Sequence, residues 1–411
     1  MKYEDFSAVL SYLAGEYALE HRHIYAKIWY DEKEGKIGKR GKLARVIYMT
    51  NIGTIPDESF VSVVLASDKN TRIGMVDEAF LERMKKGDVF VLGGKRYEFV
   101  YSMGMKAFVK GSVNRPPTIP SWFSEMLPLS FDLALEIARF RRLVEDRLKK
   151  KESEERIKEF IKEFCYVNEK IAGKIYEHLY LQNKSSGIAS DKKIVVENYR
   201  AEREYWLFHS LFGRRVNDAL SRAIAFCIGR IGGRDIEIGI NDNGFYLIGE
   251  KIDKEKINKA LGFLTSKNLE EVLKEIIERT EMFKRRFRHC AGRSLMILRN
   301  YKGRKQTAGR QQVSSSLLMF AIEKLSKEFP IMKEARREIF EEVMDIENAK
   351  LILDLIKEGK IKIEHKETNI PSPFSLNLII QGRYDLIKIE DRVAFLKRVY
   401  AEIKKAGGKT E

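Results

Sequence analysis

The sequence predicts an α+β protein that combines a small antiparallel β unit with a largely helical domain containing β-hairpins. Two features lead to this class. Short runs rich in β-branched and aromatic residues, separated by Gly, Lys and Asp, fill residues 60–113, as in a small antiparallel sheet or barrel. Beyond residue 130, apolar residues recur every three or four positions, as in amphipathic helices. The length of 411 residues favours two or three domains.

The N-terminal part begins with a helical pattern. Phe6, Val9, Leu10 and Leu13 recur at helical spacing, which predicts a short helix that ends near Gly15. A polar, glycine-punctuated segment leads into the apolar run ARVIYM and the turn-like NIGTIPD. The cluster RPPTIPSWF is the main concentration of prolines and marks the clearest boundary in the chain.

The longest helical signal follows that boundary. If the helix is continuous from Phe131 to Phe164, it is about 50 Å long at 1.5 Å per residue. We interpret the charged run KKKESEERIKE in its middle as a solvated helix face, with a hinge as the alternative.

The next segments alternate between strand and helix patterns. KKIVVENYR and EYWLFHS predict strands, and RRVNDALSRAIAFCIGRIGG predicts a helix ended by glycine. DIEIGINDNGFYLIGE predicts a hairpin in which Asn243 and Gly244 supply the positive φ angles of a tight turn. Acid-rich helices are expected from Lys254 to Phe283.

The charge of the chain favours a polyanionic partner. Lys and Arg exceed Asp and Glu by 76 − 60 = 16, and the isoelectric point is near 9.4. This excess alone does not distinguish nucleic acid from a membrane surface, or from a merely soluble basic protein. The three cysteines are scattered, no apolar run is long enough to cross a bilayer and no signal peptide is present. We therefore predict a cytoplasmic protein that does not enter membranes and that is nucleoid-associated if it binds DNA.

Several kinds of chemistry are missing from the sequence. It contains no Gly-x-x-x-x-Gly-Lys-Ser/Thr loop, which would cradle nucleotide phosphates, and no DEAD or DEAH box. The pairs around His21 and His289 lack the partners of a zinc site, and Asn241–Gly244 lacks the ligand ladder of a calcium loop. We therefore predict no catalytic residue, no metal site and no cofactor in this chain.

The strongest constellation is the basic stretch that begins at Lys284. No acidic residue occurs between Glu281 and Glu323, and Phe283 and Phe287 begin an apolar helix face from which the arginines mostly point away. A positive turn between two helices suits phosphate binding, whereas the alternative is a solvated face that pairs with neighbouring acidic segments. The candidate nucleic-acid-binding residues of this stretch are Arg285, Arg288, Arg299, Lys302, Arg304, Lys305 and Arg310.

Two further features add candidates. Lys39, Arg40, Lys42 and Arg45 lie among glycines, as in the flexible wing or arm of a DNA-binding module. Trp122 follows the proline cluster, where an exposed indole can stack on a base, although an anchor between domains is an equal alternative. A third basic group, around Arg214, Arg215 and Arg222, lies on an amphipathic helix that we interpret first as half-buried.

Several segments together resemble the Lhr (large helicase-related) family of superfamily 2 helicases. They are, in the order that the family has them, NIGTIPDESFVSVVL, RIGMVDEAFLERMKKGDVFVLGGKRYEFV, RPPTIPSWFSEM, LFHSLFGRRVNDALSRAIA and PSPFSLNLIIQG. The resemblance covers about residues 4–400 and implies the C-terminal part of such an enzyme, without its two RecA-like motor domains. It also implies that Trp122 stacks on a base of the tracking strand.

The resemblance extends the predicted fold to a winged-helix remnant, the small β unit and a helical domain that could include tandem winged-helix elements. The expected parts are the end of a winged-helix domain at 1–55, a β-rich unit at 56–118, a long-helix segment with strands at 119–210 and a helicase-associated domain at 211–411. The expected function is to bind single-stranded DNA or a DNA–RNA hybrid, and the chain is expected to have no ATPase activity of its own. The resemblance implies ATP and Mg only for a missing motor part. The alternatives are a glycosylase-like base-excision domain and a structural subunit that docks onto a RecA-like motor on another chain.

Overall fold

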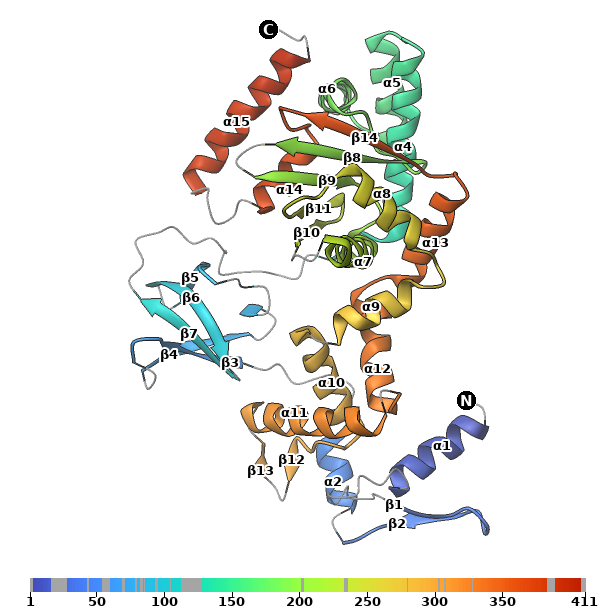
Figure 1. Ribbon diagram of the computed structural model, residues 1–411, viewed down its shortest axis with the longest axis vertical. Helices are drawn as coiled ribbons and strands as arrows, with labels where there is room; N and C mark the ends of the chain where they lie inside the picture. Colours follow the sequence, from blue (N-terminus) through green and yellow to red (C-terminus); the bar gives the residue numbers. More distant parts are fainter. Residues whose placement is uncertain are drawn as a thin grey trace. The chain divides into compact units, whose positions relative to one another are not determined.

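The computed structural model confirms the α+β class and divides the chain into two compact units (Figure 1). Unit 1 contains Met1–Arg115 and Ile277–Ile339, and unit 2 contains Pro116–Ile276 and Phe340–Glu411. The structure describes residues 3–15, 28–42, 44–53, 60–68, 71–77, 80–81, 84, 86–92, 95–103, 105–111, 127–200, 203–232, 236–278, 280–301, 304–306, 308–326, 328–382 and 389–407.

Unit 1 begins with the predicted short helix. Helix α1 ends where Gly15 takes a φ of 86°, as expected for a glycine stop. A two-stranded hairpin and a second helix follow. Their bounds are α1 Tyr3–Ala14, β1 Ile28–Asp31, β2 Lys36–Lys39 and α2 Ala44–Asn51.

The β-rich region of unit 1 is a five-stranded sheet in the order β4-β3-β7-β6-β5. Its strands are β3 Phe60–Leu65, β4 Arg72–Asp77, β5 Val89–Leu92, β6 Lys95–Met103 and β7 Lys106–Gly111. The predicted small β unit is present and three of its strand pairs are antiparallel, but β3 pairs with β7 in parallel, which the sequence did not predict. Val61, Val63, Phe108 and Val109 are buried, which gives the sheet an apolar centre.

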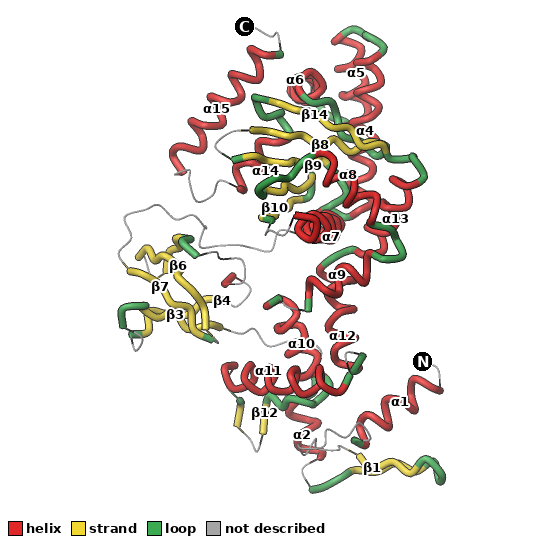
Figure 2. The backbone as a smooth tube through the Cα atoms, in the orientation of Figure 1, coloured by secondary structure: helices red, strands yellow, loops and turns green. Residues whose placement is uncertain are grey.

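Within the described residues, the rest of unit 1 contains three helices and one short hairpin. The expected basic turn between two helices is the two-stranded β12–β13 ladder, and helix α11 follows it (Figure 2). The bounds are α10 Glu281–Arg293, β12 Asn300–Tyr301, β13 Arg304–Lys305, α11 Ala308–Leu325 and α12 Pro330–Glu338, after which the π-helix η1, Ile339–Val343, leads into unit 2.

Unit 2 begins with three helices, and the predicted continuous helix is broken. Lys151 takes a left-handed φ of 56°, and Ser153 caps the next helix by accepting a bond from the backbone N–H of Arg156. A Ser followed by two acids is an N-cap signal, so the charged run contains a helix start instead of one solvated face. The helices are α4 Phe131–Lys149, α5 Glu154–Cys165 and α6 Glu169–Ser185.

A five-stranded mixed sheet, β10-β11-β9-β8-β14, forms the centre of unit 2. Both predicted strands are present as β8 Lys193–Arg200 and β9 Glu204–His209, and the hairpin is β10 Glu237–Asn241 and β11 Gly244–Ile248. Strand β14, Lys362–Thr368, pairs with β8 in parallel. Tyr205, Leu207 and Tyr246 pack with Leu378 and Ile379 of α14 on one face, and Phe208 stacks on Phe245 on the other.

The turn of that hairpin differs from the prediction. Asn241 pairs with Gly244, so Asp242 and Asn243 form the turn, and neither has a positive φ. Gly244 is required for close packing instead, because a Cβ there would lie 2.0 Å from the carbonyl oxygen of Phe208.

Among the remaining helices of unit 2, α7 and α14 contact this sheet. The predicted helix α7, Arg214–Gly232, contacts β10 and β11 through a face that buries Val216, Leu220 and Ile224. The others are α8 Lys254–Phe263, α9 Leu269–Ile277, α13 Ile346–Lys357, α14 Ser375–Gly382 and α15 Ile389–Ala406. No helix within the described residues is long and apolar enough to cross a bilayer.

Candidate nucleic-acid interface

The β1–β2 hairpin and the start of α2 present four exposed cations within a few residues. The hairpin pairs Ile28 with Lys39, and Asp31 Oδ1 holds its turn by accepting bonds from the backbone N–H groups of Lys33 and Glu34. The basic side chains from the last residue of β2 to the start of α2 are exposed, and none forms an ion pair with another described residue. They are Lys39, Arg40, Lys42 and Arg45, which we call the wing cations.

The end of α2 joins the second basic segment, about 250 residues away in sequence. Asn51 and Asn300 exchange two bonds: Asn51 Nδ2 donates to the carbonyl oxygen of Asn300 at 3.0 Å, and Asn300 N donates to Asn51 Oδ1 at 2.8 Å. Arg299 Nη2 donates to the carbonyl oxygens of Asn51 at 3.0 Å and Gly53 at 3.4 Å. The root of the β12–β13 hairpin is therefore fixed to the helix that carries Arg45, which brings the two predicted basic segments together.

The arginines of α10 are largely used inside unit 1. Arg288 is only 6% exposed. Arg286 and Arg293 both pair with Glu338, whose side chain is 2% exposed and lies on α12. Burial, together with the charges of the surrounding arginines, lowers the pKa of His289 to about 3, so this histidine is neutral near pH 7. Several arginines of the acid-free stretch are therefore used to hold α10 against α12.

The candidate nucleic-acid-binding residues of the stretch after Lys284 therefore differ in exposure and in contacts. Arg285 is half-buried, Arg288 is buried and Arg299 is half-buried with its guanidinium bound to the backbone. Arg310 is exposed on α11 and donates to Gln306 Oε1 at 3.2 Å. The backbones of Arg304 and Lys305 form β13, whereas their side chains, Lys302 and Trp122 lie outside what the structure describes.

The basic group on α7 has an internal role, as expected for a half-buried helix. Arg222 Nε lies 2.6 Å from Asp218 Oδ1, and Arg215 donates to the carbonyl oxygens of Glu341 and Met344. The Arg215 bonds tie α7 to the segment before α13, whereas the Arg222 ion pair lies within α7. Sequence reasoning overlooked Asn51 as an anchor, because its partner Asn300 is remote and no local pattern marks the pair.

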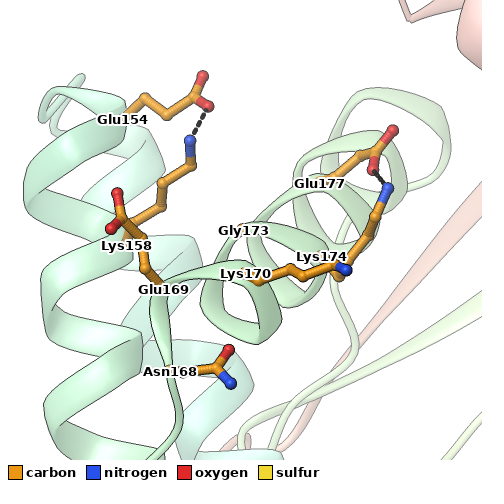
Figure 3. Close-up of a pocket in the computed structure, with 8 residues that line it drawn as sticks. All are labelled: Glu154, Lys158, Asn168, Glu169, Lys170, Gly173, Lys174 and Glu177. Atoms are coloured by element: carbon orange, nitrogen blue, oxygen red, sulfur yellow. Dashed lines mark hydrogen bonds and ion pairs between the residues drawn. The ribbon is translucent and has the colours of Figure 1, made fainter.

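A cavity of about 710 Å³ lies between α5 and α6 (Figure 3). Its charged side chains largely neutralise one another: Lys158 pairs with Glu154 at 2.6 Å, and Lys174 pairs with Glu177 at 3.1 Å. It therefore lacks the excess positive charge that attracts a polyanion. Within the described residues, no group of three or more His, Cys, Asp or Glu could hold a metal ion.

Comparisons with known proteins agree in one family. The model described as "Large helicase-related protein, winged helix domain" matches residues 1–119, and the model described as "DEAD/H associated" matches residues 188–375. ATP-dependent helicase Lhr-Core of Methanothermobacter thermautotrophicus is 49% identical over 97% of this chain and 46% of its own length. ATP-dependent helicase Lhr-Core protein 2 of Thermococcus barophilus is 44% identical over 100% of this chain and 47% of its own length.

The chain thus spans about half the length of the curated relatives it matches. A solved structure shares the fold: the Mycobacterium smegmatis helicase Lhr bound to ssDNA and AMP-PNP matches 92% of this chain and 43% of its own, with a TM-score of 0.64 and 20% identity.

Proposed function

Since this chain belongs to the Lhr (large helicase-related) family, we propose that it is the nucleic-acid-binding C-terminal module of an Lhr-type ATP-dependent helicase. It binds single-stranded DNA or a DNA–RNA hybrid through contacts with backbone phosphates. It has no ATPase activity of its own, since no phosphate-binding loop occurs in its sequence. The motor that supplies the energy belongs to a RecA-like part outside this sequence.

The observation that carries this proposal is the group of wing cations. Lys39, Arg40, Lys42 and Arg45 are exposed and form no ion pair with another described residue. Four such charges in seven positions create a local positive potential, which favours a polyanion over a neutral partner. Arg310 adds an exposed cation in the same unit. Trp122 stacking on a base remains part of the proposal through the family resemblance alone.

The experiment compares two triple variants by fluorescence anisotropy with a labelled single strand. Lys39→Gln/Arg40→Gln/Lys42→Gln removes three wing cations, and Lys360→Gln/Lys362→Gln/Lys366→Gln removes three exposed lysines of unit 2 as a matched control. We expect the wing variant to lose about tenfold or more in affinity and the control to lose much less, because only the first set contacts phosphates. Equal losses in both variants would mean that net charge, and no defined surface, governs binding.

A second role is supported by exposed apolar side chains on α11. Val313 is 62% exposed, Leu317 47% and Phe320 58%, and their spacing places them on one helix face. Such a face is typical of a surface that another protein covers. The partner that we propose is a RecA-like motor, and the test is co-purification of that motor with wild-type chain and with Leu317→Ser/Phe320→Ser. Equal recovery with both would refute this surface.

A further inference from the structure

Two buried side chains accept hydrogen bonds from the backbone of the Pro-Ser-Pro-Phe segment that precedes α14. Ser372 N donates to Glu197 Oε1 at 2.9 Å, and Phe374 N donates to Gln182 Oε1 at 2.8 Å. Glu197 Oε1 also accepts a bond from Thr368 Oγ1 at 3.0 Å. Both side chains, Glu197 and Gln182, have no exposed surface. The position of the Phe374 ring is therefore set by the core of unit 2.

Arg141 of α4 lies over that ring. Its guanidinium carbon is 4.3 Å from the centroid of the Phe374 ring, and its Nη2 donates to Asn243 Oδ1 in the β10–β11 turn at 3.1 Å. The side chain is half-buried. Burial lowers the pKa of Arg141 to about 10, which still leaves the guanidinium charged near pH 7. Two neutral groups, an aromatic face and an amide, thus hold a charged one in a fixed orientation.

Arg141 differs from the neighbouring arginines because no carboxylate among the described residues pairs with it. Arg139 pairs with Glu136 at 3.5 Å, Arg142 with Asp191 at 2.8 Å and Arg147 with Glu152 at 3.9 Å. Arg141 forms no ion pair with any residue that the structure describes.

The Phe374 ring also contacts a second basic side chain. His178 lies against the same ring, with 5.4 Å between the centroids of its imidazole and Phe374. Burial, and then the charge of Arg141, lower the pKa of His178. A half-buried cation without a counter-ion costs stability, and proteins retain such groups where a ligand supplies the missing charge.

We propose that Arg141, seated on Phe374 and oriented by Asn243, binds a backbone phosphate of single-stranded nucleic acid. A guanidinium offers five N–H donors in a planar fork that fits phosphate oxygens, and Asn243 occupies one of them. The contact with the Phe374 ring and the bond to Asn243 restrain the guanidinium before the phosphate arrives, so little side-chain entropy is lost on binding. This assignment rests on the proposed function and adds to it a phosphate contact in unit 2, apart from the wing cations.

The test compares Arg141→Gln with Arg139→Gln, which removes the same charge from an exposed position on the same helix. Affinity for a labelled single strand is measured over a range of salt concentrations. For Arg141→Gln we expect about tenfold weaker binding and a log–log salt slope shallower by about 0.7, the contribution of one phosphate contact on a single strand. Arg139→Gln should keep nearly the wild-type slope.

A thermal unfolding measurement separates this role from a structural one. Arg141→Gln removes an uncompensated charge, so its melting temperature should equal or exceed that of the wild type. A lower melting temperature with an unchanged slope would make Arg141 a structural residue and overturn the inference. If the wild type binds with a steep slope and both variants behave alike, only this inference fails. If the wild type does not bind at all, the proposed function fails with it.

Discussion

Replacement of Glu197 by Gln should remove a pH-dependent contribution to the stability of unit 2. Glu197 lies on β8 with no exposed surface, and its Oε2 is 2.9 Å from His209 Nε2. Burial by itself would raise the pKa of this carboxyl. The hydrogen bond and charge of His209, with the two donors of Ser372, outweigh burial and lower the pKa from 4.5 to about 2.

The direction of the pH effect follows from this lowered pKa. A carboxyl whose pKa is lower in the folded state stabilises that state above its unfolded pKa and loses this contribution as the pH falls. The shift from 4.5 to about 2 corresponds to about 3 kcal/mol in the free energy of unfolding. The wild type should therefore lose about 3 kcal/mol between roughly pH 4.5 and pH 2, and Glu197→Gln should lack that dependence. At pH 7 the variant should be about 3 kcal/mol less stable, and at pH 2 the two should converge.

The assay is urea unfolding followed by tryptophan fluorescence. The chain has three tryptophans, and a Trp29→Phe/Trp122→Phe background leaves Trp206, which lies on β9 opposite Asn198 of β8. Its emission therefore reports on the sheet that contains Glu197. The control is Glu367→Gln, an exposed carboxyl on β14, which should follow the wild-type pH profile. A Glu197→Gln variant that is as stable as the wild type at pH 7, or that stays less stable by the same amount at pH 2, would refute the reasoning.

Three further substitutions test the local structure. Gly244→Ala should destabilise unit 2 by about 3 kcal/mol in urea titrations, because the added Cβ would lie 2.0 Å from a backbone oxygen; a smaller effect than Ala substitution of the open Gly262 would contradict this. Ser153→Ala should cost about 1 kcal/mol of stability by circular dichroism melting, and restoration by Ser153→Asp would confirm the cap. Arg299→Ala should cost about 2 kcal/mol in urea unfolding through lost bonds to backbone carbonyls, and reduced DNA binding at full stability would show a direct contact instead.

The elements that the sequence predicts well are those set by local rules. Helical spacing with a glycine stop predicted α1 and α7, and β-branched runs predicted β8 and β9. The break between α4 and α5 was also readable, since Ser153 followed by two acids is a start signal inside the charged run. The parallel pairing of β8 with β14 could not be predicted from the sequence, because it joins segments about 170 residues apart.

The candidate interface shows the same division. The exposed wing cations follow from a short basic segment between a hairpin and a helix, which local sequence reveals. The roles of Arg286 and Arg293 depend on Glu338, a buried acid on another helix, so the acid-free stretch overstated the charge available to a ligand. The sequence analysis did not identify Arg141 as a candidate. Its contacts involve elements that are remote in sequence, and an arginine in an amphipathic helix has no distinguishing local pattern.

The central claim is that this chain binds nucleic acid by contacts with phosphates at a defined cationic surface. The most direct measurement is the affinity of the wild-type chain for a single strand at a series of salt concentrations. The four exposed wing cations alone contribute about −3 to the log–log slope, at roughly −0.7 per phosphate contact, so the wild-type slope should be at least this steep and should become shallower when three of them are replaced by Gln. A flat salt response, or the same slope in the wild type and the wing variant, would contradict the account.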